Sequence, residues 1–326
     1  MKFRHPLLAS LKRHPTYMKL IFYFVSANVL VLGISFALLY WQSSKTLLEE
    51  IGDHSESLLV NSAQNTARLM EWALEFSFSS SNDSTLKVYA LSDQYSDFET
   101  FEVWSRLMDI KNANPAIDSV YLINDYTNTV VDSRLGLNDA EAFYDQDIIK
   151  RLRNPVTANH SVLIPRTLSL PLTGNKPKEV TTIIRFYEKG SSISAFVMNV
   201  DTDNLMTLLQ NNSNYANRSV TVLNDRDETV YSSTSLNREQ IAELRNHGSK
   251  GESGWKLFQP RTQGEQLMVY ASTSIKGIQD WTFIETIPKS VILGKITVLR
   301  NTSLILFFAL FVASLTVIVL ISKRVY

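Results

Sequence analysis

The segment TTIIRFYEKGSSISAFVMNVD, residues 181–201, sets the fold expected for the middle of this chain. Two runs rich in β-branched and aromatic residues, 180–187 and 192–200, flank a short polar connection at 188–191. Strand-forming runs joined by a few polar residues are typical of an antiparallel β-hairpin. We therefore expect a β-sheet at the centre of the chain.

The residues before this hairpin continue the same pattern. SVYLIN at 119–124 and TVVDS at 129–133 flank the polar segment 125–128, which predicts a second hairpin. A helix is expected at 137–152 and a strand at 161–169. Together these elements form one α+β module.

A shorter version of the same order follows the central hairpin. The first module is expected to end in a helix that begins in 201–210, and the later module has a helix at 237–246. Strands are expected, in chain order, at 218–223, 229–232, 255–259, 265–274 and 281–287. The order of elements is repeated without sequence identity, which predicts two α+β modules in tandem.

The N-terminal third is expected to be helical. There is no proline from Thr16 to Asn114, and no glycine from Asp53 to Leu135, so long helices can run unbroken. We predict a stalk helix over 44–79 and a helix capped by Asp97 that ends before Pro115. A heptad-type seam follows the stalk at Leu48, Ile51, Ser55, Leu58, Ser62, Asn65, Leu69, Trp72 and Phe76. It fits either a partner helix or a helix that lies along its own domain.

Two uncharged runs predict membrane spans. Residues 20–41 supply 22 mostly apolar positions, about 33 Å of helix, which is enough to cross the hydrocarbon layer. A cleaved signal peptide is the alternative, but the run exceeds the usual apolar region and lacks a clear cleavage site. The second run, 301–322, is too long and apolar for an ordinary buried core helix. Asn28, inside the first span, marks a dimer contact or is simply tolerated.

The charges orient the chain. Residues 1–41 hold five Lys/Arg and no acid, and Lys323 and Arg324 follow the second span. Positive residues favour the cytoplasmic side, so both termini are expected there and 42–302 outside, in a multi-pass cell-membrane protein. The expected parts are a cytoplasmic N-terminus (1–19), a first span (20–41), a stalk and helical region (42–116), a membrane-distal module (117–212), a membrane-proximal module (213–302), a second span (303–322) and a cytoplasmic tail (323–326).

Composition argues against several functions. Residues 42–302 hold 25 Lys/Arg against all 32 Asp/Glu, a net charge of −7 that is unfavourable for nucleic-acid binding. Cysteine is absent, so thiolate chemistry and cysteine metal sites are excluded. The five histidines are scattered, and no nucleotide-binding, nucleophile-elbow or zinc-protease motif occurs. We expect no enzyme activity, cofactor or metal.

The chain resembles the double Cache (tandem PAS-like) sensor regions of bacterial membrane receptors. It is most similar to those of Gram-positive AraC-type transmembrane regulators and of sensor histidine kinases. The likeness rests on 20–79, SVYLIN and TVVDS, the strand around Ile164-Pro165-Arg166, the segment 181–201, TVLNDRDETVYSS at 221–233, and DWTFIETIP at 280–288. It implies an α+β fold in which two transmembrane helices flank the tandem modules on a long stalk. Such receptors continue past the second span into a cytoplasmic output domain. Residues 322–326 are too few to form one.

The resemblance implies a ligand site in the distal module. Candidate residues on or beside its strands are Tyr121, Asp132, Arg134, Arg166, Arg185 and Tyr187. Paired arginines can hold a carboxylate, Asp132 an ammonium, and a tyrosine can line a pocket. An Arg followed closely by Trp-Tyr, typical of amino-acid-binding Cache domains, does not occur.

The expected function is ligand sensing. A solute or cell-wall-derived molecule binds outside, and a homodimer transmits the change to a regulator or kinase output, either lost from a truncated or fragmentary product or supplied as a separate protein. The alternative is a two-pass protein whose outer domain is a structural or assembly module.

Overall fold

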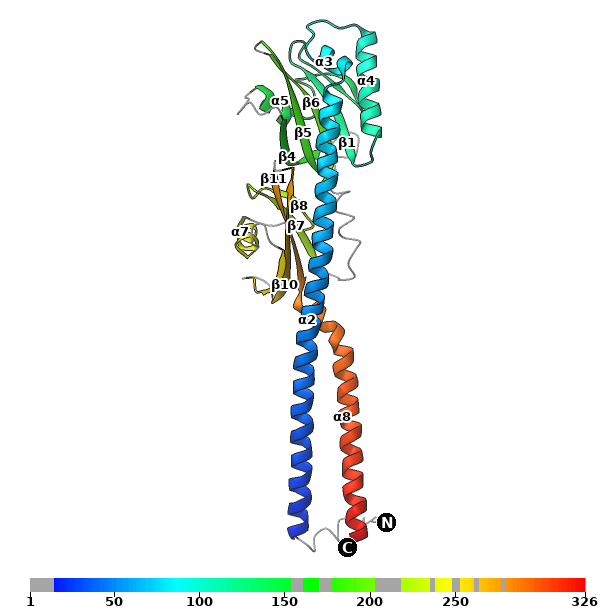
Figure 1. The fold of residues 1–326 in the computed structure, drawn as a ribbon, viewed down its shortest axis with the longest axis vertical. Helices are drawn as coiled ribbons and strands as arrows, with labels where there is room; N and C mark the ends of the chain where they lie inside the picture. Colours follow the sequence, from blue (N-terminus) through cyan, green and yellow to red (C-terminus); the bar gives the residue numbers. More distant parts are fainter. Residues whose placement is uncertain are drawn as a thin grey trace, which may run out of the picture. The chain divides into compact units, whose positions relative to one another are not determined.

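The computed structural model describes residues 15–153, 161–169, 177–190, 192–202, 218–234, 238–247, 253–260, 264–276 and 279–325. The chain divides into two compact units: the first comprises Met1–Ile51 and Pro288–Tyr326, and the second is Gly52–Ile287 (Figure 1). The helix expected to begin in 201–210 lies almost wholly outside the described residues.

The described residues of the first unit are almost entirely helical. Its members are the first part of α2 (Pro15–Ser81) and all of α8 (Lys289–Val325). Both helices are long and apolar enough to cross a membrane, and large side chains such as Phe22 and Ile305 are exposed. The Asn28 side-chain amide donates a hydrogen bond of 3.3 Å to Ser314 Oγ, so this polar residue contacts the other apolar helix of the same chain.

The second unit contains a six-stranded antiparallel sheet in the order β3-β2-β1-β6-β5-β4, and we call this part the six-stranded module. The strands are β1 (Ile117–Asn124), β2 (Thr129–Asp132), β3 (Gly136–Asp139), β4 (Ser161–Ser169), β5 (Pro177–Lys189) and β6 (Ser192–Asp201). Asn124 pairs with Thr129, and Lys189 with Ser192, so both predicted hairpins are confirmed.

The helix predicted at 137–152 is only half right. The first part is strand β3, which pairs back onto β2, and only α5 (Gln146–Arg153) is helical. Gly136 has a φ of 72°, a conformation that side chains with a Cβ rarely adopt, and it turns the chain into an extra edge strand. Similarly, α4 (Asp97–Asn112) is capped by Ser96 with Glu99 in a capping box, one residue before the predicted cap.

The two faces of the six-stranded sheet are covered by different helices. On one face, a core cluster of Tyr121, Ile148, Ile184 and Val197 packs with α5. Side chains alternate along a strand, so the neighbouring residues of β5 and β6 point to the opposite face. That opposite face is covered by α3 (Ser84–Ala90), by α4 and by the C-terminal end of α2 (Figure 1).

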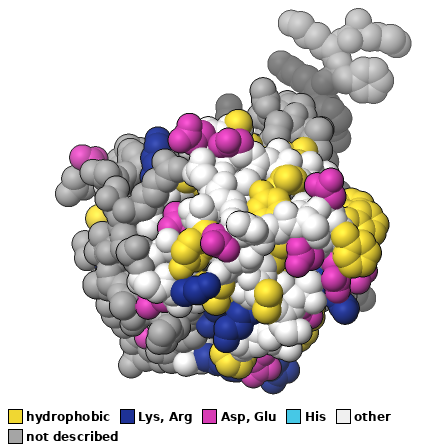
Figure 2. Space-filling model, turned by 90° about the horizontal axis from the view of Figure 1, so that it is seen from above, with side chains coloured by type: hydrophobic (Ala, Val, Ile, Leu, Met, Phe, Trp, Pro, Cys, Tyr) yellow, Lys and Arg dark blue, Asp and Glu magenta, His cyan; other side chains and the backbone are white. Residues whose placement is uncertain are grey.

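At this end of the molecule α4 buries Val103 and Leu107, whereas Phe98 and Phe101 are exposed. Seen from above, acidic, basic and hydrophobic side chains are interspersed over the described part of the surface (Figure 2). The centre of the exposed Phe101 ring lies 5.7 Å from that of the half-buried Trp104 ring, so these aromatic residues are neighbours on α4.

The five-stranded module forms the rest of the second unit. Its sheet has the order β8-β7-β11-β10-β9. The strands are β7 (Ser219–Asn224), β8 (Thr229–Ser232), β9 (Gly254–Phe258), β10 (Gln266–Ile275) and β11 (Gln279–Pro288), and α7 (Arg238–His247) packs on one face through Ile241. All five strands and α7 agree with the sequence prediction within two residues.

The stalk part of α2 lies along its own domain. Its buried side chains include Leu59, Ala63, Met70, Ala73 and Ser77. These positions differ from the predicted seam beyond Ser55, whose members there are half-buried or exposed. Beyond Ser55, the seam therefore does not mark the face of α2 that packs on the domain. The packing face there includes small residues such as Ala63 and Ala73, which let the strands approach the helix closely.

Gly52 is the tightest of these approaches. A Cβ at this position would overlap the Trp255 ring, whose Nε1 donates a hydrogen bond of 2.7 Å to Asp53 Oδ1. This tryptophan packs on the helix backbone at Gly52 and is bonded to the aspartate that directly follows it. A helical glycine is tolerated here because no side chain fits.

We expect Gly52→Ala to lower the unfolding temperature of the full-length protein. Overpacking costs about 1–3 kcal/mol, against about 1 kcal/mol gained in helix propensity. Gly294→Ala, in a helix with open space around it, is the matched control and should be neutral or stabilising. Differential scanning fluorimetry measures both. A Gly52→Ala protein as stable as the control would contradict the close contact.

Candidate functional site

A buried ion pair lies on the α5 face of the six-stranded sheet. Arg166 on β4 donates from Nη1 to Asp145 Oδ1 at 2.6 Å, and its Nη2 reaches the other carboxylate oxygen. Asp145 directly precedes α5, and it also accepts a hydrogen bond from the Tyr121 hydroxyl of β1. The loop before α5 is thereby joined to two strands of the sheet.

Two further strands complete the bonding of Arg166. Its Nε donates to Thr182 Oγ1 on β5 at 2.6 Å, and Nη2 donates to Asn199 Oδ1 on β6 at 3.1 Å. Asn199 in turn donates to Ser119 Oγ on β1 at 2.9 Å. We call Ser119, Tyr121, Asp145, Arg166, Thr182 and Asn199 the arginine cluster.

Burial sets the electrostatics of this cluster. The side chain of Arg166 is 10% exposed and that of Asp145 is 2% exposed. Burial alone would lower the pKa of Arg166, but the bonds from Asp145 and Tyr121 raise it above its usual value. Burial, followed by the charge of Asp145, raises the pKa of Tyr121 well above 10. Arg166 is therefore a permanent buried cation, and Tyr121 stays a neutral donor.

Asp132 lies beside the arginine cluster. Its Oδ1 accepts the backbone N–H groups of Arg134 and Leu135 at 2.7 and 2.9 Å, and Oδ2 accepts the Tyr144 hydroxyl at 3.1 Å. Burial raises the pKa of Asp132, although these hydrogen bonds act in the opposite direction. The Phe143 ring packs edge-to-face against Tyr121 and at a tilt against Tyr144, and it adds an apolar wall.

The other three candidates lie elsewhere. Arg134 pairs with Asp118 at 2.9 Å, and Lys178 bonds to the same carboxylate oxygen. Arg185 and Tyr187 point to the opposite face of β5, where Arg185 Nη2 donates to the Leu74 carbonyl at 2.9 Å and the Tyr187 hydroxyl to the Ser81 carbonyl at 2.6 Å. The structure thus gathers Tyr121, Asp132 and Arg166, and it separates Arg185 and Tyr187 from them.

A hollow adjoins this stalk contact. A cavity of about 350 Å³ is lined by Phe78, Lys87, Arg185 and Tyr187 among others. The Arg185 guanidinium lies 5.6 Å from the centre of the Phe78 ring and donates to Ser77 Oγ at 3.2 Å. Arg185 is already bonded to α2, so its role here is to attach the sheet to the stalk.

Five residues of this site were not predicted from the sequence: Ser119, Tyr144, Asp145, Thr182 and Asn199. Asp145 was assigned to a continuous helix at 137–152, in which a lone aspartate looks like a solvated surface residue. The alternation along β5 does place Thr182 on the face opposite Arg185, but the sequence does not indicate which face carries α5. No group of three or more His, Asp or Glu residues within the described part of the chain is placed to hold a metal ion.

Comparison with known proteins supports a sensory fold. No protein-family model matches the sequence, and no curated protein matches it either. Solved structures do match. The periplasmic sensory domain of the Campylobacter jejuni chemoreceptor Tlp1 has a TM-score of 0.54 at 13% identity, over 76% of this chain and 98% of that one. The C. jejuni Tlp3 sensory domain with isoleucine bound has a TM-score of 0.50 at 12% identity, over 76% and 97%.

These similarities establish the fold class. The α+β part of the chain has the fold of the sensory domains of bacterial chemoreceptors. The α+β class expected from the sequence resemblance is therefore confirmed at the level of the fold.

The burial of the arginine cluster predicts that the protein is sensitive to the loss of either charge. Arg166→Met leaves the Asp145 carboxylate buried without its cation, and we expect a loss of about 3–5 kcal/mol in the free energy of unfolding. The double variant Arg166→Met/Asp145→Leu removes both charges and should recover much of that loss. Chemical denaturation of the full-length protein measures the two changes and their coupling.

The exposed pair Arg151–Asp147 is the matched control. Its N–O distance is 3.2 Å and its side chains are 54% and 60% exposed. Arg151→Met should cost less than about 1 kcal/mol. Equal costs for the Arg166 and Arg151 variants would contradict the burial of the arginine cluster.

Proposed function

We propose that this chain is the extracytoplasmic sensing part of a bacterial membrane receptor, and that a small molecule binds at the arginine cluster. The observation that carries the proposal is a buried, fully bonded Arg166–Asp145 pair on the sheet of a chemoreceptor-type sensory fold. Stability alone gives little reason to keep such a pair, because apolar residues of similar volume often stabilise a protein equally well.

The chemistry of the cluster favours a zwitterionic ligand. A guanidinium holds a carboxylate through two parallel hydrogen bonds, and a carboxylate holds an ammonium group. A ligand that carries both groups can therefore replace the Arg166–Asp145 pair with one ion pair to each residue. Phe143 and Tyr144 then line its apolar part. The Tlp3 sensory domain, which shares this fold, was solved with isoleucine bound.

Strand β5 supplies a route for the signal. Thr182 contacts Arg166 on one face of the strand, whereas Arg185, three residues later, bonds to Leu74 and Ser77 of α2 on the other face. A ligand that separates Arg166 from Asp145 changes the bonding of Thr182 and the strand that carries Arg185. The ligand shifts the conformation only if it binds one conformation more tightly than the other, and a difference of about 1–3 kcal/mol is typical of such coupling.

The membrane arrangement belongs to the same proposal. The residues from 42 to 302 lie outside the cell, the two apolar helices cross the membrane, and both termini are cytoplasmic. Two helices of the required length and polarity support this arrangement, as does the basic N-terminal segment. A homodimer and an AraC-type or kinase output follow from the sequence resemblance.

A ligand screen tests the binding step. We expect at least one amino acid or other small zwitterion to raise the unfolding temperature of the full-length protein in lipid nanodiscs. A ligand at 100 times its Kd adds about 2.7 kcal/mol to the free energy of unfolding. For a domain of this size, that raises the unfolding temperature by roughly 5–10 °C.

Two variants show where that ligand binds. Arg166→Lys keeps the charge but loses the planar fork, and it should weaken binding by about tenfold or more. Arg151→Lys, on the surface of α5, should bind like the wild type. A ligand whose affinity is unchanged by Arg166→Lys would place the site elsewhere, and a broad zwitterion panel without any shift would contradict the proposal.

A further inference from the structure

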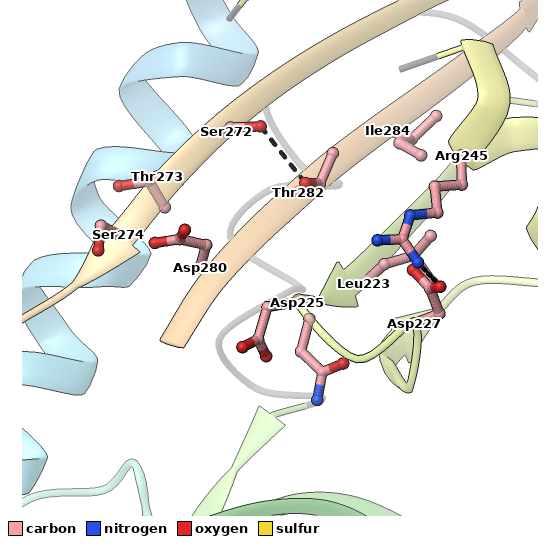
Figure 3. A pocket seen from close by; sticks show the side chains of 11 residues that line it. Leu223, Asp225, Asp227, Arg245, Ser272, Thr273, Ser274, Asp280, Thr282 and Ile284 are labelled. Carbon is pink, nitrogen blue, oxygen red and sulfur yellow. Dashed lines mark hydrogen bonds and ion pairs between the residues drawn. The ribbon is translucent and has the colours of Figure 1, made fainter. Parts of the chain in front are cut away.

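A second cavity lies in the five-stranded module. It has a volume of about 360 Å³, within the range of small-molecule sites. The walls come from the end of β7 and the following turn, from β10, from the start of β11 and from Arg245 of α7 (Figure 3). The core residues Leu223 and Ile284 provide an apolar surface on its inner side.

The charged groups of this cavity are unequally bonded. Arg245 forms an ion pair with Asp227 on one side, and the carboxylates of Asp225 and Asp280 lie on the other (Figure 3). The side-chain carboxylates of Asp225 and Asp280 make no hydrogen bond or ion pair with any other described residue, in contrast to Asp227. Three aspartates against one arginine leave two negative charges in excess.

The polar but uncharged lining adds acceptors. Ser272 and Thr282 share a hydrogen bond of 3.3 Å, and Thr273 and Ser274 follow on β10. Hydroxyl oxygens can accept hydrogen bonds from N–H groups of a bound molecule. The cavity therefore combines two unpaired carboxylates, hydroxyl acceptors and an apolar floor.

A metal ion does not fit this arrangement. Over the described residues, no three carboxylate or histidine side chains converge closely enough to coordinate one ion. An organic dication instead spreads its two charges over the length of a hydrocarbon chain, and its methylene groups can lie on Leu223 and Ile284. The excess of two negative charges matches two ammonium groups.

We infer that this cavity is a second ligand site, independent of the arginine cluster, and that it binds a linear diamine or polyamine. Asp225 and Asp280 each hold one ammonium group, and the Arg245–Asp227 pair closes the opposite side. The two sites lie on different sheets, so one chain can respond to a zwitterion and to a dication separately.

Titration with 1,4-diaminobutane tests the site. Isothermal titration calorimetry on the full-length protein in nanodiscs, at 150 mM salt, should show one saturable binding event per chain. Loss of either charge-assisted bond should weaken binding by about tenfold or more, so Asp225→Asn and Asp280→Asn should each do so. Both side chains are exposed, so the unfolding temperature without diamine should stay at the wild-type value.

The controls separate this site from general acidity and from the first proposal. Asp93→Asn removes the same charge from an exposed position in the six-stranded module and should bind the diamine like the wild type. Arg166→Lys should do the same, whether or not a zwitterion binds the arginine cluster. 1-Aminobutane should bind at least about tenfold more weakly, and Mg²⁺ at equal concentration should not compete. The inference is overturned if Asp225→Asn and Asp280→Asn bind as tightly as the wild type, or if Asp93→Asn weakens binding equally.

Discussion

A guanidinium and a carboxylate buried together on one face of a β-sheet constrain much of the six-stranded module. Taking two charges out of water costs several kcal/mol each, so every hydrogen-bonding group around them has to be positioned. Arg166 therefore gathers Asp145 from the loop before α5, Tyr121 from β1, Thr182 from β5 and Asn199 from β6. Four strands and the α5 region share one network, and a change in any member is felt by the others.

The same sheet uses its opposite face for attachment to the stalk. Arg185 donates to the Leu74 carbonyl inside α2. Tyr187 donates to the Ser81 carbonyl at the end of α2, where the last turn of a helix leaves acceptors unsatisfied. One strand, β5, thus carries a bonding partner of the arginine cluster and an anchor of the stalk. The five-stranded module touches the same helix through Trp255 and Lys276, so α2 is the element that both modules share.

Local patterns in the sequence were sufficient for most of the architecture. The hairpins at 119–133 and 181–201 follow from strand-forming runs around polar connections, and the two apolar helices follow from length and composition alone. β3 escaped prediction because its short run, GLND, has no strand-like alternation and depends on the backbone conformation of Gly136. The arginine cluster could be predicted only in part. Arg166 and Asp145 are brought together by the long-range packing of β4 and the loop before α5, which no local sequence pattern predicts. Strand alternation shows which residues share a face of the sheet, but it does not show which helix covers that face.

Hydrogen–deuterium exchange on the full-length protein tests the central claim that the two faces of β5 are coupled. Wild type, Arg166→Lys and the surface variant Arg151→Lys are compared at the amides of residues 74–81. The account predicts faster exchange at the end of α2 in Arg166→Lys only, although those amides lie against the opposite face of the sheet. A change confined to α5 and β4, with 74–81 exchanging as in the wild type, would contradict it.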